Sequence, residues 1–181
     1  MIEKYALFKV IKKLLEEPKE YSIRGLAKEA NIGLGTAKLS LDYLYGKKLL
    51  NKKVIGKTHQ YSLNKYFLTK YIRVLSSLAQ VSEAGLVEEI LTRCKNIISI
   101  VLYGSAARGE DNALSDIDIL IITRKRLKIM PLKAEKRINR EVVILNCSLV
   151  EWKEKAKKDK VFYDRVIIDG IPLYGEIPAV I

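Results

Sequence analysis

The 181-residue chain has little cysteine, no long apolar run and a shortage of acidic residues, and each absence excludes a class of protein. Cys94 and Cys147 are too few for a disulfide framework and lack the spacing of a metal site. We therefore expect reduced, buried thiols and a cytoplasmic protein. No apolar stretch approaches the roughly 20 residues that cross a bilayer. The charged N-terminus lacks the apolar block of a signal peptide, so we expect no membrane association.

The shortage of acidic residues is confined to the first part of the chain. Residues 1–75 contain 16 Lys and Arg against 6 Asp and Glu, a net charge of +10, whereas residues 76–181 contain 17 against 15, a net charge of +2. This asymmetry indicates a polyanionic partner for the first part. A basic surface that serves only solubility is the alternative, and charge alone does not decide between them.

The first 64 residues follow the order helix, helix, helix, hairpin. Apolar spacing predicts helices over residues 2–17, 23–30 and 34–45. Ser22 is a suitable N-cap for the second helix, and Gly46 a suitable end for the third. Two short strands are expected over residues 49–55 and 60–64, joined by residues 56–59.

This layout resembles a winged-helix domain, chiefly in the stretch NIGLGTAKLSLDYLYGKKLLNKKVIGKTHQYSLN, which looks like the recognition helix and wing of that family. The resemblance implies that the third helix enters the major groove of double-stranded DNA. The residues then expected to contact DNA are Thr36, Lys38, Lys52, Lys53 and Lys57. A protein-interaction or dimerisation module is the alternative, and a homodimer stays open.

Residues 64–96 form a helical connector with a break expected at Gly85. It contains no Pro- or Ser-rich linker, which favours a rigid connection between two domains. The boundary is expected between residues 70 and 82. We accordingly predict a winged-helix domain over residues 1–75 and a second domain over residues 76–181.

The second domain centres on two apolar runs separated by a polar loop. Residues 97–103 and 116–122 are predicted strands. Asp116 and Asp118 lie two residues apart, so on a strand their carboxylates share one face, roughly 6–7 Å apart. Two such carboxylates repel each other unless a cation lies between them. Their hard oxygen atoms favour Mg²⁺ or Mn²⁺.

A candidate phosphate site lies between the two strands. Gly104 and Ser105 close the first strand and precede a short helix expected from about Ala106. Free N–H groups at a helix N-terminus hold phosphate well, and the Ser105 hydroxyl can donate to a phosphate oxygen. Arg108, one turn later, is placed to neutralise triphosphate charge.

The stretch LYGSAARGEDNALSDIDILII resembles the nucleotidyltransferase superfamily, which includes DNA polymerase β, kanamycin nucleotidyltransferase and the minimal nucleotidyltransferases of prokaryotes. It fits the Gly-Ser-x10-Asp-x-Asp signature of that superfamily without a gap. The resemblance implies a nucleoside triphosphate bound at Gly104 and Ser105, and two Mg²⁺ held by Asp116 and Asp118. A hydroxyl then attacks the α-phosphorus, which transfers NMP and releases pyrophosphate.

The superfamily normally adds a third carboxylate from a later strand. The candidate is Glu141, at the start of a predicted strand over residues 141–146, where the family usually has Asp. The longer side chain shifts the position available to a metal. The alternative is that Glu141 forms an ion pair with Arg140 or Arg137.

We therefore predict an α+β protein in which a winged helix-turn-helix precedes a small mixed sheet flanked by helices. Its predicted activity is Mg²⁺-dependent NMP transfer from an NTP, with ATP one candidate, to a hydroxyl of a protein or small molecule. Some minimal members of the superfamily modify a toxin of the HEPN class, which suggests such a partner by analogy. One alternative is a transcriptional regulator or antitoxin-like protein that only senses nucleotide, and another is an adaptor whose winged helix binds a protein.

Overall fold

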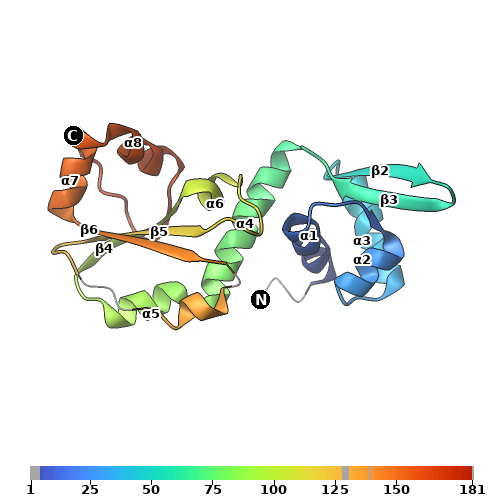
Figure 1. Cartoon of the computed structure of the whole chain (residues 1–181), viewed down its shortest axis with the longest axis horizontal. Coiled ribbons are helices and arrows are strands. Elements are labelled where there is room, and N and C mark those ends of the chain that lie inside the picture. The colour runs from blue at the N-terminus through green and yellow to red at the C-terminus, as the bar shows by residue number, and fades with distance from the viewer. Residues whose placement is uncertain (1–4, 128–130, 139, 181) are drawn as a thin grey trace. The chain divides into compact units, whose positions relative to one another are not determined.

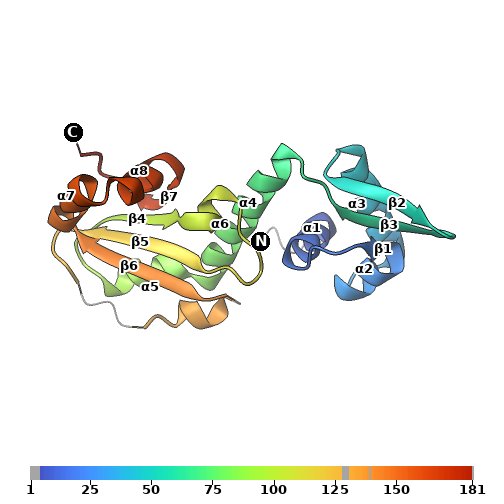
Figure 2. The same ribbon diagram turned by 45° about the horizontal axis from the view of Figure 1, so that its top comes forward.

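A computed structural model describes residues 5–127, 131–138 and 140–180 and divides the chain into two compact units, Met1–Arg73 and Val74–Ile181. Each unit has its own sheet and its own buried core (Figures 1 and 2). The predicted α+β class is confirmed. Within the described ranges, no helix is both long and apolar enough to cross a membrane.

The first unit consists of three helices and a three-stranded antiparallel sheet. Its elements are α1 (Ala6–Glu16), β1 (Tyr21–Ser22), α2 (Ile23–Glu29), α3 (Leu34–Gly46), β2 (Leu50–Ile55) and β3 (Thr58–Leu63). The strand order is β1-β3-β2. The fully buried side chains of Leu14, Leu41 and Tyr61 join α1, α3 and β3 in one core. Burial of apolar side chains from the helices and the sheet therefore stabilises the fold of this unit.

The predicted boundaries in this unit need small corrections. Residues 2–4 of the first predicted helix lie outside the described residues. Ser22 caps α2 as expected, because its hydroxyl accepts a hydrogen bond from the Gly25 N–H at 3.1 Å. The hairpin is tighter than predicted: β3 begins at Thr58, so only Gly56 and Lys57 form the turn. Gly56 has a φ of +60°, which suits a two-residue turn.

The helical connector contains α4 (Phe67–Ala84) and α5 (Leu86–Arg93), separated by Gly85 as predicted. Gly85 has a φ of +67°, a conformation that side chains with a Cβ rarely adopt. The last turns of α4 bury Val81 and Ala84 in the core of the second unit.

The second unit is built on a four-stranded mixed sheet. Its strands are β4 (Ile97–Tyr103), β5 (Ile117–Thr123), β6 (Val142–Ser148) and β7 (Ile171–Gly175), in the order β6-β5-β4-β7. β5 and β6 are parallel, and the other neighbours are antiparallel. Its remaining helices are α6 (Gly104–Arg108), the 3₁₀ helix η2 (Ala134–Arg137), α7 (Leu149–Lys158) and α8 (Lys160–Asp169).

Helices cover both faces of this sheet (Figures 1 and 2). Ile117, Ile119 and Ile121 face the side that α4 and α5 cover, as the alternation of the strand predicts. The intervening Leu120 packs on the other side with Trp152 of α7 and with α8. Because alternate residues of β5 face opposite ways, Asp118 shares its face with Leu120.

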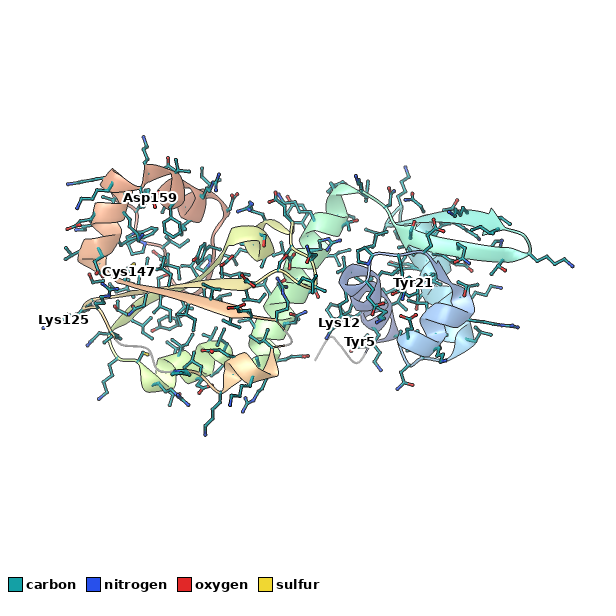
Figure 3. All side chains as sticks on the ribbon, in the orientation of Figure 1. Tyr5, Lys12, Tyr21, Lys125, Cys147 and Asp159 are labelled. Atoms are coloured by element: carbon teal, nitrogen blue, oxygen red, sulfur yellow. The ribbon has the colours of Figure 1, made fainter. Side chains whose placement is uncertain are left out.

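The two cysteines are both free thiols. Cys147 of β6, labelled in Figure 3, is buried in one apolar cluster with Trp152 of α7, and burial raises its pKa to about 11. A thiol with so high a pKa is a poor nucleophile. Cys94 is only partly buried, so the prediction of two buried thiols is wrong for this residue.

A capping box begins α7. The Ser148 hydroxyl accepts a hydrogen bond from the Glu151 N–H, and the Glu151 carboxylate accepts one from the Ser148 N–H. Ser148→Ala removes one of these bonds and is expected to lower the free energy of unfolding by about 1 kcal/mol. Urea unfolding measures this change. Ser62→Ala, at a strand position, is the control, and equal decreases in both variants would contradict a specific contribution from the cap.

Candidate active site

Asp116 and Asp118 lie at the start of β5. The strand begins at Ile117, one residue later than predicted, so Asp118 is inside the sheet and Asp116 immediately precedes it. Asp118 lies opposite Tyr103 of β4 in the antiparallel ladder and is partly buried, whereas Asp116 is exposed. The two carboxylates thus differ in surroundings although they belong to one motif.

The surroundings of Asp118 disfavour its negative charge. Burial raises the pKa of this carboxyl group, and the nearby charge of Asp116 raises it further. Arg108 and Arg140 oppose this shift but do not cancel it. Burial, with the charge of Asp118, also raises the pKa of Tyr103. A cation bound at this position would offset the unfavourable charge, which agrees with the predicted chemistry of the pair.

Gly104 approaches Asp118 more closely than any other residue type allows. Its φ is +72°, and a Cβ built on it would lie 2.2 Å from Asp118 Oδ2. Real Cβ atoms essentially never come within 3.0 Å of such an atom. Because Gly104 has no side chain, its backbone lies directly against the Asp118 carboxylate.

The other two predicted phosphate contacts belong to α6. This helix begins at Gly104, two residues earlier than expected, and it places Ser105 in its first turn. Arg108 is in its last turn, and its Nε donates to Glu110 Oε2 at 2.7 Å. Arg108 thus has an acidic neighbour of its own, and it also lowers the pKa of Asp118. Gly109, with a φ of +63°, ends the helix.

Glu141 lies beside the pair without joining it. β6 begins at Val142, one residue later than predicted, and the exposed Glu141 precedes it. Its carbonyl accepts a hydrogen bond from the Ile117 N–H at 2.8 Å. The parallel register pairs Val143, rather than Glu141, with Asp118. Over the described part of the chain, no three His, Cys, Asp or Glu side chains are grouped so that they could hold a metal ion.

Sequence reasoning missed a buried network at the same end of the sheet. Arg140 forms an ion pair with Asp111 at 2.7 Å, and both side chains are only 6% exposed. It also donates to the backbone carbonyls of Ser115 and Asp116. The suggested pairing of Glu141 with Arg140 would have to compete with these hydrogen bonds. Asp111 and Arg140 are 29 residues apart, and no local pattern marks them as partners.

The predicted DNA contacts of the first unit occupy several elements. Thr36 and Lys38 are exposed on α3, and Lys57 is exposed in the hairpin turn. Lys53 forms an ion pair with Glu20. Lys52 has its Nζ 3.9 Å from Asp42 and lies over the ring of Tyr61.

Comparison with known proteins identifies the second unit. Residues 86–177, half of the chain, match the family model described as polymerase beta, nucleotidyltransferase. A crystal structure of a provisionally assigned nucleotidyltransferase from Sulfolobus solfataricus is 22% identical over 60% of this chain and 88% of its own, with a TM-score of 0.33. No curated protein sequence matches the chain. From the family match and the arrangement around β4 and β5, the chain belongs to the polymerase beta nucleotidyltransferase family.

Proposed function

We propose that the second unit transfers NMP from a nucleoside triphosphate to an acceptor hydroxyl. The observation that carries the proposal is the apposition of Gly104 and the Asp118 carboxylate, with Asp116 beside it. A partly buried carboxylate with a raised pKa, with the Gly104 backbone against it and a second carboxylate beside it, is suited to hold a divalent cation. Family membership supplies the reaction class.

Each residue of the site has a proposed role. Asp116 and Asp118 would hold Mg²⁺ or Mn²⁺, because paired carboxylates are the hard oxygen donors that these ions prefer. Gly104 and Ser105 bind the phosphates, and Arg108 neutralises part of their charge. Divalent cations, when bound, stabilise the charge that develops on the phosphoryl group and the attacking hydroxyl.

Glu141 is proposed as the third carboxylate. Parallel pairing of β5 and β6 places it at the same end of the sheet as Asp116. Because it is exposed, its side chain is able to reorient when a substrate binds. Glu141→Gln tests this role. If Glu141 is a metal ligand or a general base, the substitution lowers the rate of NMP transfer. If Glu141 is only a surface residue, the rate stays unchanged.

The test of the proposal is transfer of label from α-labelled ATP to acceptor in the presence of Mg²⁺. Candidate acceptors are the protein itself, small hydroxyl compounds and a toxin partner of the HEPN type. The other three nucleotides are tested in parallel. If no transfer depends on Asp116 and Asp118, the second unit is not an active nucleotidyltransferase.

The observation that no third carboxylate joins the pair among the described residues favours a second candidate, a regulator that senses nucleotide without turnover. Such a protein binds ATP and changes its DNA affinity, yet releases no pyrophosphate. Pyrophosphate release measured alongside ATP binding separates the two candidates. The two free thiols support a cytoplasmic setting for either one.

For the first unit, we propose a winged-helix domain that binds double-stranded DNA. The order helix, strand, helix, helix, strand, strand supports the assignment, as does the net charge of +10 over residues 1–75. α3 is proposed as the recognition helix, with Thr36 and Lys38 on its exposed side. Docking to a protein, or formation of a homodimer, is the competing use of this unit.

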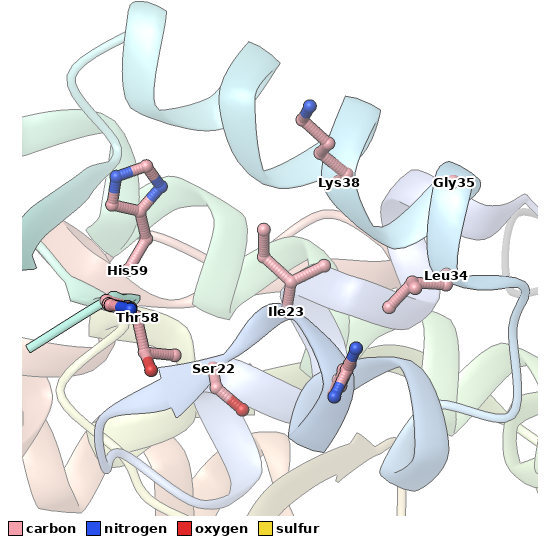
Figure 4. A pocket seen from close by; sticks show the side chains of 9 residues that line it. Ser22, Ile23, Leu34, Gly35, Lys38, Thr58 and His59 are labelled. Carbon is pink, nitrogen blue, oxygen red and sulfur yellow. The ribbon is translucent and has the colours of Figure 1, made fainter.

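An open groove suggests where DNA phosphates bind. It lies between the first turns of α2 and α3 and the hairpin turn, with Lys38 and His59 at its sides (Figure 4). Arg24 and Lys57 also line it. Arg24, Lys38 and Lys57 are exposed, so their charges are available to a polyanion.

The groove leads to a prediction about which lysines matter. Lys38→Gln combined with Lys57→Gln is expected to lower the slope of log affinity against log salt by about 2, because each substitution removes one lysine–phosphate ion pair. Lys52→Gln combined with Lys53→Gln should have a smaller effect, because Asp42 and Glu20 already lie beside these lysines. Titration of a labelled duplex at several salt concentrations measures both slopes.

The same DNA titrations also test the alternative that the first unit docks to a protein rather than to DNA. Both double variants remove two positive charges, so they are matched in net charge. Equal decreases of the slope in the two variants would contradict the groove. The absence of salt-dependent DNA binding by the unaltered protein would favour the protein-docking alternative.

A further inference from the structure

Arg140 binds both ends of the loop that leads into β5. Its Nη1 donates to Asp111 Oδ2 at 2.7 Å, near the start of the loop. Its Nε donates to the Ser115 carbonyl at 2.6 Å, and its Nη2 to the Asp116 carbonyl at 3.1 Å, at the end of the loop. A single planar guanidinium group therefore fixes the separation of the two ends.

The same network anchors the loop to α4. Ser77, which is 1% exposed, donates its hydroxyl to Asp111 Oδ2 at 3.0 Å. Arg140 Nη1 lies 3.2 Å from the same hydroxyl. Hydrogen bonds stabilise a buried charge pair of this kind, and those to Asp111 Oδ2 come from Ser77 of α4 and from Arg140 in the segment before β6.

Hydrogen bonds between residues of the loop also stabilise its conformation. The Asn112 carboxamide accepts from the Leu114 N–H at 2.8 Å, and the Ser115 hydroxyl accepts from the Asn112 N–H at 3.0 Å. These bonds shape the turn but do not connect it to the sheet. The ion pair of Arg140 with Asp111 connects the loop to the segment before β6.

Asp116 depends on this connection more than Asp118 does. Asp118 is paired in the ladder between β4 and β5, whereas Asp116 precedes the first residue of β5. The carbonyl of Asp116 accepts a hydrogen bond from Arg140 Nη2, and the next N–H, from Ile117, donates to the Glu141 carbonyl. The backbone that carries the Asp116 carboxylate is thus held from the segment containing Arg140 and Glu141.

We propose that Arg140 is a positioning residue for the carboxylate pair: it fixes the backbone of Asp116 so that its carboxylate and that of Asp118 bind a divalent cation together. The inference rests on the proposed function of this pair. Arg140 itself contacts neither the cation nor the nucleotide in this scheme. Its positioning effect is exerted through the Ser115 and Asp116 carbonyls and is separate from its charge, which favours the ionised form of Asp118.

Three variants weaken the network to different degrees. Arg140→Gln removes the charge and most donors, and Arg140→Lys keeps the charge but loses the planar fork that reaches three acceptors at once. Ser77→Ala removes one hydroxyl and leaves the ion pair in place. Arg137→Gln is the matched control, because Arg137 is a nearby arginine that donates instead to the Ala84 carbonyl at 3.1 Å.

The first measurement is the affinity of the full chain for Mn²⁺ in the absence of nucleotide. The electron paramagnetic resonance signal of the free ion reports how much Mn²⁺ remains unbound. Arg140→Gln is expected to weaken Mn²⁺ binding about 10–100-fold, the range found for residues that orient metal ligands. Arg140→Lys and Ser77→Ala should weaken binding to an intermediate extent, and Arg137→Gln should leave it unchanged. The second measurement is hydrogen exchange of the amides of residues 109–116, which should accelerate in the same order.

The outcomes separate this inference from the proposed function. If Asp116→Asn and Asp118→Asn abolish Mn²⁺ binding but Arg140→Gln binds as the unaltered protein does, the positioning role is overturned while the metal site stands. If the unaltered protein binds no Mn²⁺ through the two aspartates, both proposals are wrong. Where Arg140→Gln does not fold, Ser77→Ala decides: unchanged loop exchange and unchanged Mn²⁺ binding in this variant overturn the inference.

Discussion

Asp118→Asn is expected to reduce NMP transfer about a thousandfold, because the loss of several kcal/mol of charge stabilisation at the transition state corresponds to about three powers of ten in rate. Asp116→Asn should have an effect of similar size. The asparagine side chain keeps the shape of aspartate but provides only one weak oxygen donor to a hard cation. Each substitution therefore removes a ligand without removing volume.

The same substitutions should leave the fold intact or make it more stable. The pKa of Asp118 is raised by burial and by Asp116, so its folded-state pKa lies above its unfolded-state pKa. The charged carboxylate therefore destabilises the folded state at neutral pH, and this penalty decreases as the pH falls below the folded-state pKa and is gone below the unfolded-state pKa. Asp118→Asn removes the penalty at pH 7, so the free energy of unfolding should rise while activity falls.

Label transfer from ATP and urea unfolding, measured on the same preparations, check this combination. Glu154→Gln is the control, because Glu154 is an exposed carboxylate on α7 that pairs with Lys158. It should change neither quantity appreciably. Asp118→Asn with full activity would refute the assignment, and a strongly destabilised Asp118→Asn would show that the carboxylate has a structural partner in the folded protein.

The parts of the site that the sequence predicted are those close together along the chain. Gly104, Ser105, Asp116 and Asp118 belong to one motif, and strand alternation is enough to place Asp118 on the face opposite to Ile117, Ile119 and Ile121. The helices of the first unit were predicted within a few residues for a similar reason, since caps and apolar periodicity are local signals.

The parts that sequence reasoning missed depend on tertiary contacts. Arg140, Asp111 and Ser77 are brought together by α4, a loop and the start of β6, and no periodicity links them. Likewise, Lys52 and Lys53 look equivalent to Lys57 in the sequence. Only the fold places Asp42 and Glu20 beside the first two. Charge counts predicted a basic unit but not which of its charges are already neutralised.

Gly104→Ala is expected to lower NMP transfer about a hundredfold, the decrease that a misplacement of about 1 Å at a reacting centre produces. The added methyl group would lie 2.2 Å from Asp118 Oδ2 and 3.0 Å from its Cγ. Either the carboxylate or the junction of β4 and α6 must move to relieve this contact. Both movements change the distance between the proposed phosphate site and the proposed metal ligands.

Gly85→Ala separates this contact from backbone strain. Gly85 has a φ of +67°, close to the +72° of Gly104, but its nearest neighbour would lie 3.8 Å from an added Cβ. Both alanine variants should lose about 1–2 kcal/mol of unfolding free energy from the left-handed backbone. Only Gly104→Ala should lose activity, and equal activity in the two variants would contradict the role assigned to the close approach.

A double variant decides whether Gly104 acts through Asp118. If the alanine methyl group impairs transfer by displacing the carboxylate, Gly104→Ala should cost little further activity once Asp118→Asn has removed the metal ligand. If Gly104 acts separately, by admitting a phosphate to the backbone, the two decreases should multiply. The measurement is the rate of NMP transfer by the unaltered protein, the two single variants and the double variant at saturating ATP and Mg²⁺. Comparing the rate decrease of the double variant with the product of the two single decreases gives the coupling between the substitutions, which distinguishes the two mechanisms.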